Sequence, residues 1–318
     1  MIKITRPPIK LLARHSDWRP EELDAALDKH VRADAERWRW LLRMLLPAIG
    51  IGFLACGILF FFAYNWADIP KFGKLGISAA AVTIPCALSL FFSFSELTRK
   101  MLLTAAAFLV GPFFGVFGQI YQTGANAYDL FLAWGVFILI WVLTVNFAPL
   151  WALFLVLLNV TVALYFEQVA SGWSTVVVVF ILFVINTLAA ATFIFLDERP
   201  ESFSYPEWFK KAASLAAVLA GTACCCIVIV EVDSRPGNLL FVAPVLVIFA
   251  GVARAAYRNQ KSYYLTLLAF SIIAIVATVI IRIDLNIGGL LIATIWVVAG
   301  TTGSTILLNT FRKDWRYE

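Results

Sequence analysis

Charged side chains are scarce in this sequence: Asp, Glu, Lys and Arg make up 14% of the 318 residues, whereas hydrophobic residues make up 62%. Soluble domains contain about 25% charged and about 45–50% apolar residues. The few charges also stand in short clusters between long uncharged runs. Because a soluble fold of this length needs polar residues to cover its surface, the composition excludes an ordinary soluble protein and predicts that lipid is the surrounding solvent.

Histidine is nearly absent, and the apolar runs lack most residues that carry chemistry. The only histidines, His15 and His30, precede the first apolar run, so no zinc-ligand spacing is present. No pair of carboxylates lies deep in an apolar run, which disfavours a proton pump and an intramembrane enzyme. The five cysteines lie in apolar runs without His or acidic neighbours at metal-site spacing, as small packing residues do: Cys56, Cys86, Cys224, Cys225 and Cys226. We therefore expect no enzyme activity, catalytic residue, metal site or cofactor.

The basic residues do not indicate a nucleic-acid partner, although the net charge is +5. They flank the apolar runs and form no separate basic face or recognised binding motif. A cleavable signal peptide is also not expected, because the first apolar run starts near Leu41 after a long segment that contains seven acidic residues. The first span should therefore remain in the membrane as an anchor.

Ten apolar runs are long enough to cross a bilayer, since a helix of about 20 residues spans about 30 Å of hydrocarbon. They cover residues 45–63, 75–95, 101–118, 130–147, 149–166, 173–196, 212–232, 239–256, 262–281 and 287–308. Only Asn146, Phe147, Ala148 and Pro149 separate the fourth and fifth runs, which favours a tight helical hairpin. The sequence thus predicts an all-α polytopic membrane protein, with an N-terminal segment over 1–44, a transmembrane domain over 45–308 and a tail over 309–318.

Lys and Arg residues alternate between the two sides of these spans. If the N-terminus lies inside, 21 of them fall in inner segments and four, Lys71, Lys74, Arg235 and Arg282, fall in outer segments. Inner segments of membrane proteins are enriched in these residues. A missed or invented span would scramble the alternation, so the pattern predicts an even number of crossings with both termini in the cytoplasm.

A few polar and aromatic residues lie inside the predicted spans. Asn159 and Asn186 are the deeper polar residues, and we expect each to hydrogen-bond between helices with an energy of about 0.6–2 kcal/mol. Trp134, Trp141 and Trp296 lie away from the span ends and are expected to pack between helices.

One amphipathic helix is predicted before the membrane, over residues 20–43. Pro20 suits the first helical position, and Glu21 and Glu22 favour the positive end of the helix dipole. Its apolar residues recur mainly at four-residue steps: Leu23, Leu27, Val31, Ala35 and Trp38. This stripe requires a partner. The protein's own cytoplasmic loops, the inner leaflet and a second protein are the alternatives.

Two polar runs are predicted to leave the membrane on the outer side, one after the first span and one after the third. We take seven of their residues as a candidate ligand cluster: Tyr64, Asn65, Trp66, Gln119, Tyr121, Gln122 and Asp129. Amides beside aromatic rings can hydrogen-bond to and stack on a sugar or a lipid headgroup. The alternative is that these groups cap helix ends and anchor them at the interface.

A family resemblance rests on the same residues. The features are the charged N-terminal helix, a glycine-containing first span that ends in AYNW at 63–66, a nearby proline and lysine, the run GQIYQTGA at 118–125 and the tract from Tyr128 to Trp134. With these features, residues from about 10 to 165 resemble the bacterial membrane family catalogued as domain of unknown function 2157. The resemblance implies a membrane protein and carries no activity or site role.

Two functional hypotheses follow from the span count and the polar runs. The first is a transporter or flippase of a neutral or amphipathic solute, because ten spans permit two five-helix halves. The second is a non-catalytic scaffold or sensor in envelope biogenesis, whose protein partner would bind residues 20–43. The family likeness and the basic inner loops indicate a bacterial inner membrane, with an organellar membrane as the alternative.

Overall fold

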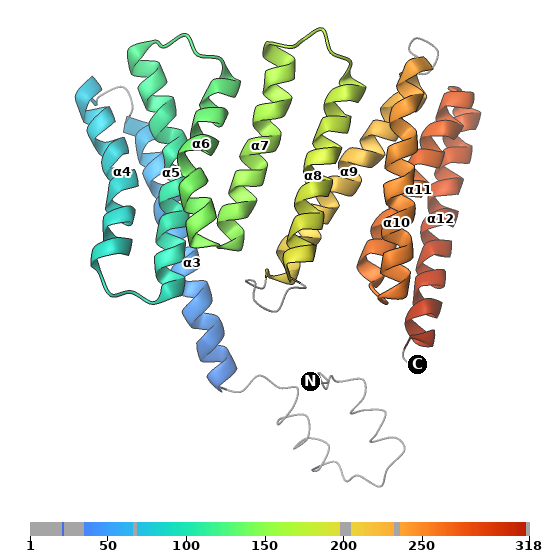
Figure 1. The fold of residues 1–318 in the computed structure, drawn as a ribbon, viewed down its shortest axis with the longest axis horizontal. Coiled ribbons are helices and arrows are strands. Elements are labelled where there is room, and N and C mark those ends of the chain that lie inside the picture. The colour runs from blue at the N-terminus through green and yellow to red at the C-terminus, as the bar shows by residue number, and fades with distance from the viewer. Residues whose placement is uncertain (1–20, 22–34, 66–68, 198–204, 232–235, 316–318) are drawn as a thin grey trace. The chain divides into compact units, whose positions relative to one another are not determined.

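The computed structural model describes residues 21, 35–65, 69–197, 205–231 and 236–315. This described part contains helices and no strand (Figure 1). The helices are α3 (Ala35–Asn65), α4 (Lys71–Phe91), α5 (Glu96–Tyr121), α6 (Ala127–Val145), α7 (Ala148–Gln168), α8 (Thr175–Asp197), α9 (Glu207–Glu231), the 3-10 helix η1 (Pro236–Phe241), α10 (Val242–Arg258), α11 (Ser262–Ile283) and α12 (Ile287–Asp314).

Nine helical segments in the described part are long and apolar enough to cross a membrane, counting η1 and α10 as one segment. They coincide with the second to tenth predicted spans, so the predicted all-α polytopic fold is confirmed. The first predicted span, 45–63, lies inside α3, in which Leu41–Leu54 forms a shorter apolar stretch. Which ends of the helices face the cytoplasm stays a prediction.

The chain forms two compact units, Met1–Phe117 and Gly118–Glu318, and the division falls within α5. In the first unit, α3 runs without a break through the predicted boundary between residues 44 and 45. Most of the predicted amphipathic helix over 20–43 lies outside the described residues. α4 and α5 continue as helices through Pro85 and Pro112.

A tight hairpin joins α6 and α7 in the second unit, as the sequence predicted. Asn146 ends α6 with a left-handed backbone (φ 48°, ψ 59°), and Pro149 lies in the first turn of α7, where its missing N–H is harmless. The Tyr205 hydroxyl donates a hydrogen bond of 2.7 Å to Asn146 Oδ1. Burial raises the pKa of the Tyr205 phenol, so the group stays protonated and keeps this bond. The hairpin is thereby attached to the segment before α9.

Helix α9 is the centre of the second unit and packs against α8, α10 and α11. A cluster of fully or nearly fully buried side chains joins α8, α9 and α10 through Phe183, Cys224, Cys225 and Phe249. Small residues on α9 permit the close approach. At Gly221 an added Cβ would lie 2.9 Å from ring atoms of both Phe183 and Phe249. The cysteines in this cluster are free thiols that serve as core residues.

Polar side chains connect the helices inside the second unit. Asn159 on α7 and Asn186 on α8 exchange two amide hydrogen bonds, of 3.2 and 2.6 Å, which bears out the predicted interhelical role of this pair. The Thr222 and Ser271 hydroxyls lie 2.6 Å apart between α9 and α11. The indole N–H of Trp296 on α12 donates to the Ile273 carbonyl of α11 at 3.1 Å, so this tryptophan packs between helices as expected.

The outer faces of the helices are as apolar as the packed faces. On α6, Ile138 and Val142 are fully buried, while Ile140 is 70% and Leu143 is 61% exposed. On α10, Val245 is fully buried and Val247 is 70% exposed. Water would not tolerate such side chains along the length of so many helices, but hydrocarbon would. The exposed faces are therefore lipid-facing.

Candidate functional site

The predicted outer cluster is divided between the two units. In the first unit, Tyr64 lies in the last turn of α3 and is 89% exposed, and Asn65 is the last residue of that helix. Trp66 lies outside the described residues. In the second unit, Gln119, Tyr121 and Gln122 are exposed at the end of α5, and Asp129 is half-buried in the first turn of α6. Their action as one ligand cluster stays a prediction.

Local geometry gives several residues of the second polar run a capping role. The Thr123 N–H donates to the Gly118 carbonyl at 3.3 Å, and Gln122 and Gly124 have positive φ angles of 46° and 65°. This is the pattern of a helix C-terminus closed by a left-handed residue. The Asn126 N–H then donates to Asp129 Oδ2 at 2.9 Å, which caps the start of α6. The second polar run thus stops α5 and starts α6.

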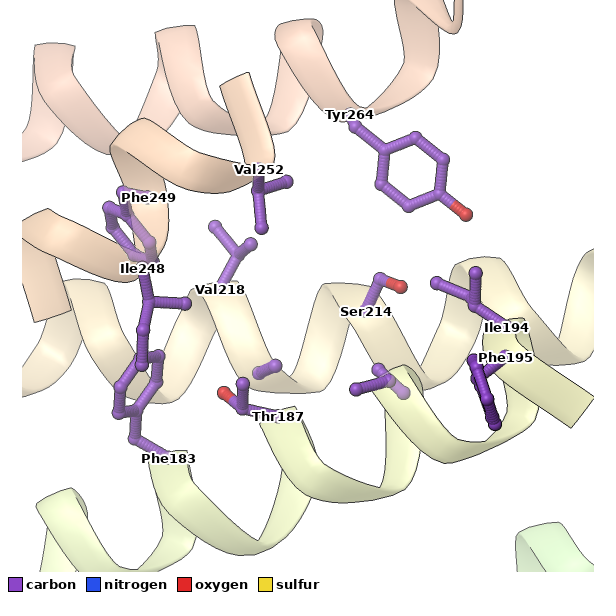
Figure 2. A pocket seen from close by; sticks show the side chains of 13 residues that line it. Phe183, Thr187, Ile194, Phe195, Ser214, Val218, Ile248, Phe249, Val252 and Tyr264 are labelled. Carbon is purple, nitrogen blue, oxygen red and sulfur yellow. The ribbon is translucent and has the colours of Figure 1, made fainter. Parts of the chain in front are cut away.

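A pocket in the second unit, of about 350 Å³, lies between α8, α9, α10 and α11 (Figure 2). Helix α9 contributes Ser214, Ala217 and Val218, and α11 contributes Tyr264. Apart from Thr187 on α8, the residues that α8 and α10 contribute are apolar. They are Phe183, Ala190, Ala191, Ile194, Phe195, Ile248, Phe249 and Val252. This pocket is an apolar space inside the set of membrane-crossing helices.

Three hydroxyl groups interrupt the apolar lining. The Ser214 Oγ donates to the Lys210 carbonyl at 2.8 Å, which leaves its lone pairs as acceptors. The Ser214 and Tyr264 hydroxyls point into the same space (Figure 2). The Thr187 Oγ1 is buried and has no hydrogen-bond partner in the described part of the chain. A few hydrogen-bonding groups in an otherwise apolar cavity are typical of sites that orient an amphipathic ligand.

A second cavity, of about 210 Å³, adjoins the pocket and leads to the loop between α10 and α11. The two cavities share Ile194, Val252 and Tyr264, and the second adds Asn259 and Lys261 from that loop. We call this end of the pocket the mouth, defined by Asn259, Lys261 and Tyr264. The lining therefore changes from apolar to basic along its length.

Two further lysines lie near this end, at the start of α9. Lys210 is 7% exposed, and its Nζ lies 2.6 Å from Glu207 Oε1. The Lys211 Nζ lies 5.5 Å from the centre of the Tyr263 ring, and the Tyr263 hydroxyl donates to the Lys211 carbonyl at 3.0 Å. The contacts tie the start of α9 to the start of α11 beside the mouth.

Sequence reasoning did not identify the pocket. Ser214 and Thr187 occur singly in apolar runs, where such hydroxyls usually bond to their own helix and leave no signal of a cavity. At the start of the ninth predicted span, the combination of Lys261 with Tyr263 and Tyr264 is a feature of the sequence that could have indicated a polar site. Only the packing of α8, α10 and α11 against α9 reveals that the polar groups share a space.

Basic residues gather at one end of the second unit, the lower edge in Figure 1, where α9 and α11 start and α10 and α12 end. They are Lys210, Lys211, Arg254, Arg258, Lys261, Arg312 and Lys313. Arg282, in the last turn of α11, lies at the opposite end. The pocket mouth is at the basic end, which the sequence pattern predicts to be cytoplasmic.

The apolar membrane-crossing helices define a multi-pass α-helical membrane protein, which requires a lipid bilayer. Residues 19–151 match the family described as "Predicted membrane protein (DUF2157)", and the resemblance predicted from the sequence is confirmed over that range. No curated protein and no solved structure gave a significant match to the chain. The pocket of the second unit lies beyond the residues that match the family.

Proposed function

We propose that this protein is a non-enzymatic transporter or flippase of an amphipathic molecule in the bacterial inner membrane. The observation that carries the proposal is the pocket between α8, α9, α10 and α11. Its volume of about 350 Å³ falls within the range of small-ligand sites, about 300–1,000 Å³. Transporters typically bind their substrate between helices within the membrane.

The position of the pocket also supports an amphipathic solute over a polar one. The mouth residues lie at the helix ends, whereas Phe183 and Phe249 belong to the buried core of the unit. A molecule that follows the lining from the mouth inward would pass from polar to apolar surroundings. The sequence analysis proposed a lipid headgroup as a ligand of the outer polar runs. The pocket and its mouth support binding of such a molecule better than those runs do.

The proposal predicts that the protein moves a single-chain phospholipid between leaflets. The purified protein would be reconstituted into phosphatidylcholine vesicles that contain a fluorescent lysophospholipid, and dithionite would bleach the label in the outer leaflet. We expect protein-containing vesicles to lose more fluorescence than protein-free vesicles, because inner-leaflet label becomes accessible.

The matched variants are Ala217→Phe, which fills the pocket, and Ala212→Phe, which makes the same change at an exposed position of α9. We expect Ala217→Phe to abolish the additional bleaching and Ala212→Phe to retain it. Equal movement in both variants, with both proteins monodisperse in gel filtration, would show that the pocket takes no part.

A further inference from the structure

We propose that the pocket binds one acyl chain that carries an anionic headgroup, with the chain between α8 and α10 and the headgroup at the mouth beside Lys261. This inference rests on the proposed function and names the chemical class of its substrate. A long-chain carboxylate such as palmitate is the simplest member of that class.

The length of the lining fits the chain of one leaflet. The pocket extends along α8 from Phe183 to Phe195, which at 1.5 Å per residue corresponds to about 18 Å. One half of a bilayer's hydrocarbon core is about 15 Å thick. The volume lies near the lower limit of small-ligand sites, which favours a single chain over two. The lining therefore suits one chain that enters from the basic end.

The charges at the mouth determine the sign of the headgroup. Lys261 is exposed and lines the outer cavity, and Lys211 lies on the Tyr263 ring nearby. In the described part of the chain, Glu207 is the carboxylate that faces them, and its Oε1 lies 2.6 Å from Lys210 Nζ. Glu207 also interacts electrostatically with Lys211 and Lys261. Among these four described side chains, one negative charge stands against three positive charges. An anionic headgroup would restore the balance.

The start of α11 adds to this attraction. Lys261 is the N-cap residue of α11, and its side chain makes no capping hydrogen bond to the first turn. The N–H groups of that turn form the positive end of the helix dipole and are suitable donors to a carboxylate or phosphate. Tyr264, in the same turn, lines both the mouth and the apolar pocket. The headgroup would thus meet a cation and hydrogen-bond donors together.

The test compares two ligands that differ in charge, palmitate and hexadecanol. The full-length protein would be placed in phosphatidylcholine nanodiscs at mildly alkaline pH, and the affinities would be measured with radiolabelled ligand. We expect palmitate to bind more tightly than hexadecanol. Lys261→Gln should lower the affinity for palmitate by about fivefold, as expected for the loss of one interfacial lysine, and leave the affinity for hexadecanol unchanged. Lys261→Arg should retain the preference.

The control is Lys313→Gln, which removes an exposed lysine at the same end of the unit but outside the pocket lining. It should leave both affinities unchanged. Ala217→Phe should abolish binding of both ligands.

The possible failures separate the two proposals. Equal binding of palmitate and hexadecanol, or an equal loss for both in Lys261→Gln, would overturn the anionic headgroup and leave an amphipathic solute in place. If dipalmitoyl phosphatidylglycerol displaced radiolabelled palmitate at a lower concentration than unlabelled palmitate does, the proposal that the pocket binds a single chain would be overturned. Absence of binding, or binding that Ala217→Phe does not change, would overturn the pocket as a site and the proposed function with it.

Discussion

At the scale of single residues, Gly221 decides how closely three helices approach one another. A Cβ added to Gly221 would lie 2.9 Å from ring atoms of both Phe183 on α8 and Phe249 on α10. Phe183 is 1% exposed and belongs to the buried cluster, so its ring has little freedom to move aside. Any larger residue must therefore push apart the helices that enclose the pocket.

We predict that Gly221→Ala lowers the free energy of unfolding by about 1–3 kcal/mol, the usual effect of overpacking a dense core. The measurement is unfolding in mixed micelles by titration with sodium dodecyl sulfate. Gly251→Ala is the control, because no atom lies within 4 Å of its added Cβ, and it should cause no destabilisation. Equal effects of the two substitutions would contradict the close approach at Gly221.

The chemistry of single residues was harder to predict than their location in spans. The sequence predicts an inner segment for Lys210, which stays a prediction, but it gives no indication of the 7% exposure, which depends on packing by other helices. Nothing in the sequence indicates that Ser214 and Thr187 line a cavity, because a single Ser or Thr in an apolar run can face a neighbouring helix, lipid or a cavity. The polar groups of the pocket could therefore be identified only from the structure.

At the scale of helices, the Asn159 and Asn186 pair joins α7 to α8. Each amide also donates to the carbonyl four residues earlier in its own helix, at 2.7 Å to Leu155 and 2.8 Å to Leu182. A polar group in an apolar span gains from a partner, although competing partners in the unfolded state reduce the gain. The pair should therefore stabilise the contact between these helices modestly.

A double-mutant cycle of Asn159→Ala and Asn186→Ala measures this contribution. We predict a coupling free energy of about 0.6–2 kcal/mol, because either substitution removes both interhelical bonds. The same unfolding titration provides the four free energies. Thr161→Ala is the control, because the Thr161 hydroxyl bonds within α7 to the Leu157 carbonyl at 2.7 Å. Additive effects of the two Asn substitutions would refute a direct interaction.

Helix positions followed closely from the sequence, because length and hydropathy are the properties that a bilayer selects. The hairpin at Asn146 was predicted from the proline and asparagine that interrupt a long apolar run. By contrast, one helix, Ala35–Asn65, continues across the boundary expected near residue 44, and Pro47 lies inside it. The 3-10 start of the α10 segment was also not foreseen, and Pro236 at its first position has no N–H to donate.

At the scale of the whole molecule, the apolar character of both buried and exposed faces limits what the sequence can reveal. In a soluble protein, polar positions mark the outer face of each helix and so indicate which face packs. Here Ile138 and Ile140 belong to the same residue type, yet one is fully buried and the other 70% exposed. The spans could therefore be predicted without the packing between them, and the pocket is a product of that packing.

The sorting of basic residues yields a prediction for the whole chain, which single cysteines can test. In a variant without the native cysteines, Ser171→Cys lies in the exposed turn between α7 and α8, and Arg258→Cys lies at the basic end of α10. If inner segments carry the basic residues, a membrane-impermeant maleimide should label Ser171→Cys in intact cells and reach Arg258→Cys only after permeabilisation. The reverse result would place the pocket mouth on the outer side, and the anionic substrate would then enter from the opposite leaflet.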